Sequence, residues 1–284
     1  MGRRLERAAL VALVVFTVVA VAGFATFGTH PEWLRIDPSA PAMYGAAFVV
    51  FARGHVLLAA AALFIVLARR AGKRWIPSLV AIYVVSLSSE LAGTTVGLPF
   101  GPYSYTDGLG PKWFGHVPLL IPLSWFVMTV PSYAIARRIV GARRWMGVAV
   151  GSLVLLSWDL ALDPAMSHAT KYWVWGASGP YYGMPWLNLF GWYATGLALM
   201  SILLVLRSDA WIVALPIRWI GAFYAVNLAL SLGICAAGQM TGAVIASAIP
   251  LLLCAAALRA DRTTASHAPV DADDAPVPSR AEPA

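Results

Sequence analysis

The sequence has little charge and almost no cysteine. Only 12% of its 284 residues are charged, whereas 60% are hydrophobic and the mean hydropathy is +0.74. So few charges exclude an ordinary soluble domain and predict a multi-pass membrane protein. The two cysteines, Cys235 and Cys254, both lie in apolar runs. We therefore expect small core residues that carry no information about redox compartment.

Patterns typical of several chemistries are absent as well. The sequence has no His-rich or Cys-rich metal-ligand spacing, no phosphate-binding loop and no nucleophile elbow. Its formal charge of +7 is divided among short basic clusters between apolar runs, which argues against nucleic acid as a partner. The polar residues inside the apolar runs are therefore the main guide to function.

Eight apolar runs have about the length that a bilayer requires of a helix. Basic residues alternate strongly between the connecting loops, so the positive-inside rule places both termini in the cytoplasm. The predicted fold is all-α, with one multi-pass helical domain in the cell membrane over residues 1–258. The tail, 259–284, is rich in Pro, Ala and Asp and is expected to be disordered. The first run is interpreted as a retained anchor rather than a signal peptide. The runs are 8–27, 42–68, 75–93, 117–140, 145–163, 185–206, 212–236 and 241–258.

Ionisable residues within these runs gather at one depth. Asp159 and Asp163 are four residues apart, which places both carboxylates on one helix face. The predicted orientation puts them in the outer half of the membrane with Glu90, Arg53 and His55. Because charges at this depth are costly, their convergence predicts a proton path, an ion site or a reaction centre. The simpler alternatives are that Arg53 pairs with Glu90 or Asp159 to hold helices together, and that His55 is a structural hydrogen-bonding residue.

Two loops on the same side, 97–118 and 168–185, each carry Gly-Pro-Tyr after a run with an acid near its end. Gly and Pro fix turns, and the dense aromatic residues indicate segments that fold back onto the bundle. An interfacial aromatic belt would account for part of them. We expect a substrate pocket lined by His55, Tyr103, Tyr105, Trp125, Trp158, Trp175, Tyr181, Asn188 and Trp192.

Three chemistries fit acids at this depth. Asp159, Asp163 and Glu90 could hold Mg²⁺ in a diphosphate-handling prenyltransferase, but one sparse pair facing outward does not suit it, and we expect no metal. Proton-driven transport is a second class, although no clear inverted repeat is present and the polar groups do not continue to the inner face. The third class is protonation of a lipid-soluble alkene, which needs a neutral carboxylic acid in an apolar site and aromatic rings to stabilise a carbocation.

Three segments resemble the membrane carotenoid hydratases, the family of bisanhydrobacterioruberin hydratase and carotenoid 1',2'-hydratase. They are ELAGTTVGLPFGPYSYTDGLGPKWFGHVPLLIPLSWF (90–126), WDLALDPAM (158–166) and WVWGASGPYYGMPWLNLFGW (173–192), and the resemblance spans about residues 40–260. It implies hydration of a terminal double bond on an acyclic carotenoid end, giving a tertiary alcohol without a cofactor. The implied partners are a carotenoid in the bilayer and other carotenoid-pathway enzymes.

The resemblance assigns no catalytic roles, so these come from the residues themselves. Asp159, the deeper acid, or Glu90 is the expected general acid. Asp163, closer to water, would orient or deprotonate the attacking water, and Arg53 would adjust the protonation of these acids. A membrane lycopene cyclase that shares the protonation step and a proton-coupled lipid or solute transporter remain alternatives. The choice between C40 and C50 carotenoids, the number of ends hydrated and the oligomeric state stay open.

Overall fold

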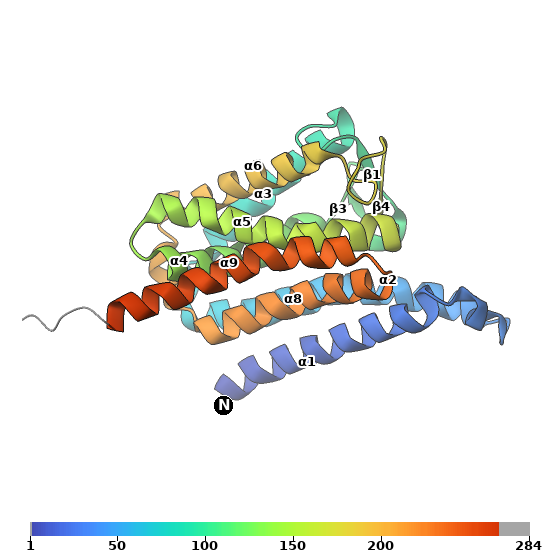
Figure 1. The fold of residues 1–284 in the computed structure, drawn as a ribbon, viewed down its shortest axis with the longest axis horizontal. Helices are drawn as coiled ribbons and strands as arrows, with labels where there is room; N and C mark the ends of the chain where they lie inside the picture. The colour runs from blue at the N-terminus through green and yellow to red at the C-terminus, as the bar shows by residue number, and fades with distance from the viewer. Residues whose placement is uncertain (1, 267–284) are drawn as a thin grey trace, which may run out of the picture.

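The computed structural model describes residues 2–266 as a bundle of long helices, with short strands gathered at one end (Figure 1). Each of the eight expected apolar runs coincides with one helix of 20 or more residues. The helices are α1 (Gly2–Gly23), α2 (Ala40–Arg70), α3 (Ile76–Val96), α4 (Leu120–Val140), α5 (Arg144–Asp163), α6 (Trp186–Val205), α8 (Ile217–Ala237) and α9 (Thr241–Ser266), with the short α7 (Asp209–Ile212).

Six of the described helices are long and apolar enough to cross a membrane: α1, α2, α3, α5, α6 and α8. This confirms a predominantly α-helical membrane protein. The central helix α4 packs against α2, α3, α5, α6 and α8, and more than half of its residues are buried. Because protein rather than lipid surrounds it, α4 can contain Thr129, Pro131 and Ser132 without exposing polar groups to hydrocarbon.

Several boundaries differ from the prediction. The first helix, expected over 8–27, is α1 over Gly2–Gly23, followed by a separate helical turn. The seventh helix was expected from residue 212, but α8 begins at Ile217, after Pro216. Proline lacks a backbone N–H and disfavours helix at the residue before it, so the chain breaks there and α7 stands apart. The last helix continues to Ser266. Helix therefore covers 259–266, which were expected in a disordered tail, and 267–284 lie outside the described residues.

Helix α1 is fixed to the bundle at the end away from the strands (Figure 1). The carboxylate of Glu6 is 5% exposed and bridges the guanidinium groups of Arg69 and Arg70 at 3.1 and 3.2 Å. The indole N–H of Trp219 on α8 donates to the backbone oxygen of Glu6 at 3.0 Å. A buried carboxylate with two cationic partners ties α1 to α2 and α8, which suits an integral helix.

The two aromatic loops meet at the opposite end of the bundle (Figure 1). Their strands β1 (Tyr103–Tyr105) and β4 (Trp173–Trp175) pair antiparallel, with Tyr103 opposite Trp175 and Tyr105 opposite Trp173. A second pair joins β2 (Lys112–Trp113) and β3 (Val117–Pro118). Short helical turns complete this end: η1 (Phe24–Gly28), η2 (Pro31–Arg35), η3 (Asp107–Leu109) and η4 (Pro164–Ala169).

Candidate active site

Strand β1 presents two tyrosines to the carboxyl group of Glu90 on α3. Successive strand residues point to opposite faces, so Tyr103 and Tyr105 turn inward while Ser104 is exposed. Both hydroxyls donate hydrogen bonds to Oε2 of Glu90, that of Tyr105 at 2.8 Å. The indole N–H of Trp125 on α4 donates to Oε1 at 2.8 Å. Three donors from two elements thus hold Glu90 in a buried position.

Strand β4 likewise presents two hydrogen-bond donors to the carboxyl group of Asp163. Trp173 and Trp175 turn inward while Val174 between them is exposed. Their indole N–H groups donate to Oδ1 of Asp163 at 3.1 and 3.2 Å. The side-chain amide of Asn188 on α6 donates to Oδ2 at 2.7 Å. The antiparallel pair therefore fixes both acids at once, because each strand supplies two donors to one carboxyl group.

The two acids differ in the kind of partner that surrounds them. A tyrosine hydroxyl can donate or accept a hydrogen bond, whereas indole and amide N–H groups only donate. Tyr103 and Tyr105 can therefore turn to accept a proton from Glu90, whereas the indole N–H groups beside Asp163 favour a carboxylate there. Burial, and next the charge of Glu90, raises the pKa of both tyrosines well above the ordinary value. Their hydroxyls stay protonated at neutral pH.

Glu90 and Asp163 line one small pocket of about 40 Å³. Roughly 10–15 Å³ is enough for one water molecule, so the pocket has room for a few waters but not for a branched hydrocarbon end. Six further residues of the predicted site line it: Tyr103, Tyr105, Trp125, Trp175, Asn188 and Trp192. The structure thus gathers predicted residues from α3, α4, α5, α6 and both strands around a water-sized space.

A much larger cavity of about 470 Å³ lies between α1, α2, α4, α5 and α8. Its lining is mostly apolar and includes Phe48, Phe51 and Met128. The cavity reaches the surface of the bundle at α1 and α2, where two of its lining residues, Val19 and Met43, are 48% and 68% exposed. An apolar space that opens on the lipid-facing side suits a long hydrocarbon ligand.

The two spaces share a wall. Four residues line both of them: Ile121, Ser124, Leu162 and Trp173. Trp173 is the most direct link, because its N–H binds Asp163 while its side chain also borders the apolar cavity. A ligand in the large cavity is therefore separated from the two acids by a single layer of side chains.

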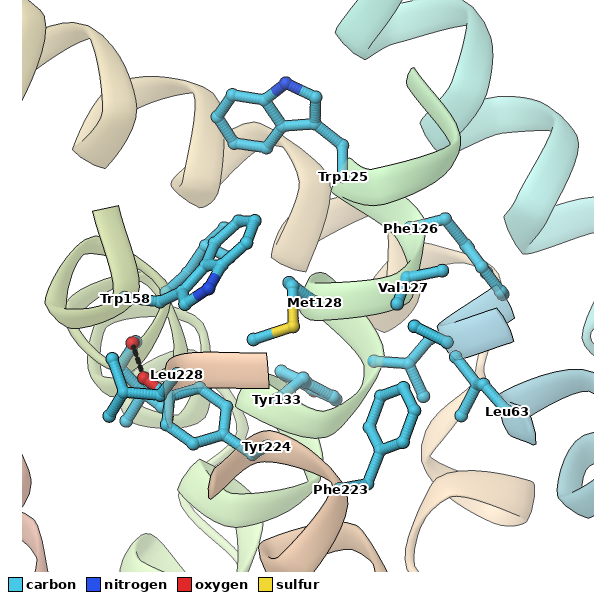
Figure 2. Close-up of a cluster of buried hydrophobic side chains, with 14 of the residues drawn as sticks. Leu63, Trp125, Phe126, Val127, Met128, Tyr133, Trp158, Phe223, Tyr224 and Leu228 are labelled. Atoms are coloured by element: carbon cyan, nitrogen blue, oxygen red, sulfur yellow. Dashed lines mark hydrogen bonds between the residues drawn. The ribbon is translucent and has the colours of Figure 1, made fainter. Parts of the chain in front are cut away.

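A run of tryptophans leads from one space to the other. The rings of Trp125 and Trp192 stack at 4.0 Å between centroids, and Trp192 meets Trp158 edge to face at 6.0 Å. Trp125 and Trp192 line the small pocket, whereas Trp158 lines the large cavity. Figure 2 shows Trp158 on the opposite side of Met128 from Phe126. The predicted aromatic lining is thus divided between the two spaces.

Asp159 lies behind this site rather than in it. It is fully buried and lines neither cavity. Its Oδ2 is 3.4 Å from the amide nitrogen of Asn188, which binds Asp163 more closely, and its Oδ1 has no partner. The four-residue spacing does place both aspartates beside Asn188. Of the two residues expected as general acid, Glu90 lines the small pocket and Asp159 does not. Among the side chains that the structure describes, no group of three or more from His, Cys, Asp or Glu could hold a metal ion.

The expected placement of Arg53 beside the acids is wrong. Its Nε and Nη2 donate to the backbone oxygens of Gly108 and Asp107 at 2.9 and 3.1 Å. The loop after β1 folds back over α2, and its carbonyl groups satisfy the guanidinium. Tyr181 also lies outside both spaces, because its hydroxyl donates to the backbone oxygen of Leu160 at 2.7 Å.

His55 faces the large cavity but serves mainly as a link between helices. Its Nε2 lies 3.2 Å from Oδ1 of Asn227 on α8, and its Nδ1 lies 3.4 Å from the hydroxyl of Thr17 on α1. Because the amide of Asn227 already donates to the oxygen of Phe223, its Oδ1 must accept from Nε2. The hydrogen-bonding role weighed from the sequence is the one that this geometry favours.

The residues of the shared wall, and Phe100, which also lines the small pocket, were not among the predicted site residues. Trp173 had a readable signal, because it stands two residues before Trp175 and strand periodicity places both on one face. No sequence signal identified Ile121, Ser124 and Leu162, because a residue within an apolar helical run looks the same whether or not it lines a cavity.

These features define a helical membrane protein with an acid-lined, water-sized pocket beside an apolar cavity. The model of the family described as "Carotenoid biosynthesis protein" matches residues 51–255, and the chain belongs to this family. A curated relative, bisanhydrobacterioruberin hydratase of Haloarcula japonica, is 33% identical over 190 residues, which cover 64% of this chain. The match spans 60% of that relative's own length. The predicted resemblance to carotenoid hydratases is confirmed. No solved structure matches the chain.

Proposed function

We propose that the protein is a hydro-lyase that adds water across the terminal double bond of an acyclic carotenoid end to give a tertiary alcohol. The wall shared by the two spaces carries this proposal: water beside two acids on one side, and room for a polyene on the other. The family match and the relative named as a hydratase support the same reaction.

The reaction begins with transfer of a proton from a carboxylic acid to the less substituted carbon of the double bond. Positive charge then rests on the tertiary carbon, where it is most stable. The oxygen of a pocket water forms the C–O bond, and the proton that it loses passes to a carboxylate. One water is consumed, and proton exchange through the remaining pocket water restores the acids. Proton transfer from a positioned side chain contributes about 10²–10⁴-fold to the rate.

Glu90 is the proton donor and Asp163 the acceptor in this proposal. A donor must exist as the neutral acid, and Glu90 has two hydroxyl partners that can accept its proton. The indole and amide N–H groups around Asp163 favour its carboxylate form. The carboxylate stabilises the carbocation and then takes the proton of the attacking water. Asp159 acts indirectly, through Asn188.

The shared wall also protects the cation. Trp173 presents a π-system between the acids and the cavity, and cations are attracted to aromatic faces. Ile121 and Leu162 are apolar and keep bulk water from the substrate side. Only the few waters of the small pocket can then reach the tertiary carbon, which favours addition of one water over other fates of the cation.

The arrangement in the membrane follows from the same proposal. All eight long helices cross the bilayer, with α4 shielded by the others and both termini on the cytoplasmic side, where the basic clusters lie. The carotenoid enters from lipid where the large cavity opens at α1 and α2. Protonation and water addition change no oxidation state, so the proposed reaction needs no redox cofactor. Other carotenoid-pathway enzymes supply the polyene and use the alcohol.

Pigment analysis in cells that accumulate acyclic carotenoids tests the function. Expression of the wild type should convert these carotenoids to products that carry one tertiary hydroxyl at a hydrated end, detected by mass spectrometry. Expression of Glu90→Gln at equal protein level is the control. Products with rings and no added oxygen would identify a cyclase instead, and proton-gradient-dependent uptake without any pigment change would identify a transporter.

A further inference from the structure

Two polar atoms on residues that line the large cavity have no hydrogen-bond partner in the described part of the protein. Among the described residues, eight buried side-chain nitrogen or oxygen atoms have no hydrogen-bond partner. Only two of those eight belong to residues that line either cavity, namely Nε1 of Trp158 and Oγ of Ser231, and both line the large one. Because a buried polar group without a partner costs free energy, a ligand atom that satisfied them would be favoured.

The two residues lie at the same level on adjacent helices. The hydroxyl of Tyr224 on α8 donates to the oxygen of Val154 on α5 at 2.6 Å, and the thiol of Cys235 donates to the oxygen of Ala161 at 3.3 Å. These contacts show that α5 and α8 run in the same direction, side by side. Trp158 lies between the two contact points on α5, and Ser231 lies between them on α8.

Ser231 differs from Ser152 and Ser157, two other buried serines of the bundle. The hydroxyls of Ser152 and Ser157 donate to the backbone oxygen four residues earlier, at 2.8 Å each. This is the usual way in which a helical serine satisfies itself. Ser231 makes no such bond although it is fully buried. Its hydroxyl therefore has no hydrogen-bond partner among the residues that the structure describes, although the residue lines the cavity.

Trp158 offers a donor close to the reaction. Its ring meets Trp192, which lines the small pocket, at 6.0 Å between centroids. Figure 2 shows its ring nitrogen on the side of Met128, another residue of the cavity lining. The neighbouring polar side chains His55 and Asn227 already bond to each other, so they do not compete for a ligand.

We propose that Trp158 and Ser231 form a docking site for the tertiary alcohol that the reaction makes. The proposal rests on the hydratase function, in which the hydrocarbon end has no oxygen before the reaction and one hydroxyl after it. The new hydroxyl accepts from the indole N–H of Trp158 and exchanges a hydrogen bond with Ser231. It thereby moves away from the shared wall, which leaves the acids free for a new water and removes the alcohol from the acid that could dehydrate it.

Binding measurements test this site without requiring turnover. The probes are an acyclic carotenoid with a tertiary alcohol at one end and the matched hydrocarbon, titrated into purified wild-type protein with tryptophan fluorescence quenching as readout. The wild type should bind the alcohol about 3- to 10-fold more tightly, the range expected of a neutral hydrogen bond. Ser231→Ala and Trp158→Phe should each reduce this preference, while the affinity of Ser231→Ala for the hydrocarbon stays the same.

Ser247→Ala is the matched control, because Ser247 is another buried serine without a partner but lines neither cavity. It should retain the full preference for the alcohol. Equal affinity of the wild type for both probes, or a preference that survives in both variants, would mean that the site holds at most a water molecule. Absence of hydration by a wild type that still prefers the alcohol would overturn the proposed reaction but not the site.

Discussion

Glu90 and Asp163 line the same buried pocket, although they come from different helices, α3 and α5. The strand pair β1–β4 makes this possible, because one strand supplies donors to Glu90 and the other supplies donors to Asp163. Because the two carboxyl groups border one space with room for only a few waters, one can donate a proton while the other accepts one.

Replacement of Glu90 by Gln should remove the proton donor while keeping the size of the side chain. We expect hydration to fall by about 10²–10⁴-fold, the usual contribution of a positioned acid. Tyr105→Phe, which removes one hydrogen bond to Glu90, should lower the rate far less. Product formation per folded protein is the measurement, and a fully active E90Q protein would remove Glu90 from the mechanism.

Replacements of the two aspartates should have unequal effects. Asp163→Asn places an amide where three N–H donors point, so we expect a loss of at least about 10²-fold. Asp159→Asn leaves the pocket lining unchanged and should cost much less activity. The comparison of kcat at equal folded protein decides between them. The reverse order would restore Asp159 as the principal acid.

Enlargement of the shared wall should block the substrate from the acids. Leu162→Trp adds bulk between the cavity and the pocket, and we expect kcat/KM to fall by about 10²-fold because misplacement by about an ångström has costs of that size. Leu153→Trp on the same helix is the control, since Leu153 is 46% exposed. An unchanged kcat/KM for L162W would show that the polyene does not react at this wall.

Arg53 should matter for stability rather than for proton transfer. Arg53→Ala removes the charged donor that holds the η3 loop through Gly108, at a cost of about 1–3 kcal/mol in the free energy of unfolding. Thermal unfolding in detergent should report this loss, while the pH dependence of hydration stays that of the wild type. A shifted pH optimum in R53A would instead show that the guanidinium changes the protonation of the acids.

The positions of the helices and of the two pocket acids were readable from the sequence for physical reasons. A bilayer imposes a length on each apolar run, and it makes Glu90 and Asp163 conspicuous because charged groups are rare at such depth. The loops 97–118 and 168–185 were recognised as segments that fold back onto the bundle, because each combines Gly-Pro turns with dense aromatic residues. The two loops are joined by the pairing of β1 with β4. This pairing depends on two segments that are distant in the sequence, so neither loop alone predicts it.

Other features required the folded chain. Arg53 finds backbone carbonyls of the loop after β1, and nothing in the sequence distinguishes such partners from carboxylates. The expectation that Asp159 could be the proton donor rested on its depth along the helix, whereas access to water depends on which side chains surround each acid. The large cavity is lined mostly by ordinary apolar residues of five helices, so no local sequence pattern predicts it.

Hydration in isotopically labelled water tests the central claim most directly, because the claim is that pocket water adds to a polyene held beyond the shared wall. Purified wild-type protein, given an acyclic carotenoid in water enriched in heavy oxygen, should yield an alcohol that carries the label in its new hydroxyl. E90Q and D163N proteins that unfold at the wild-type temperature should yield almost none. An unlabelled alcohol, or labelled product at the wild-type rate from both variants, would contradict the account.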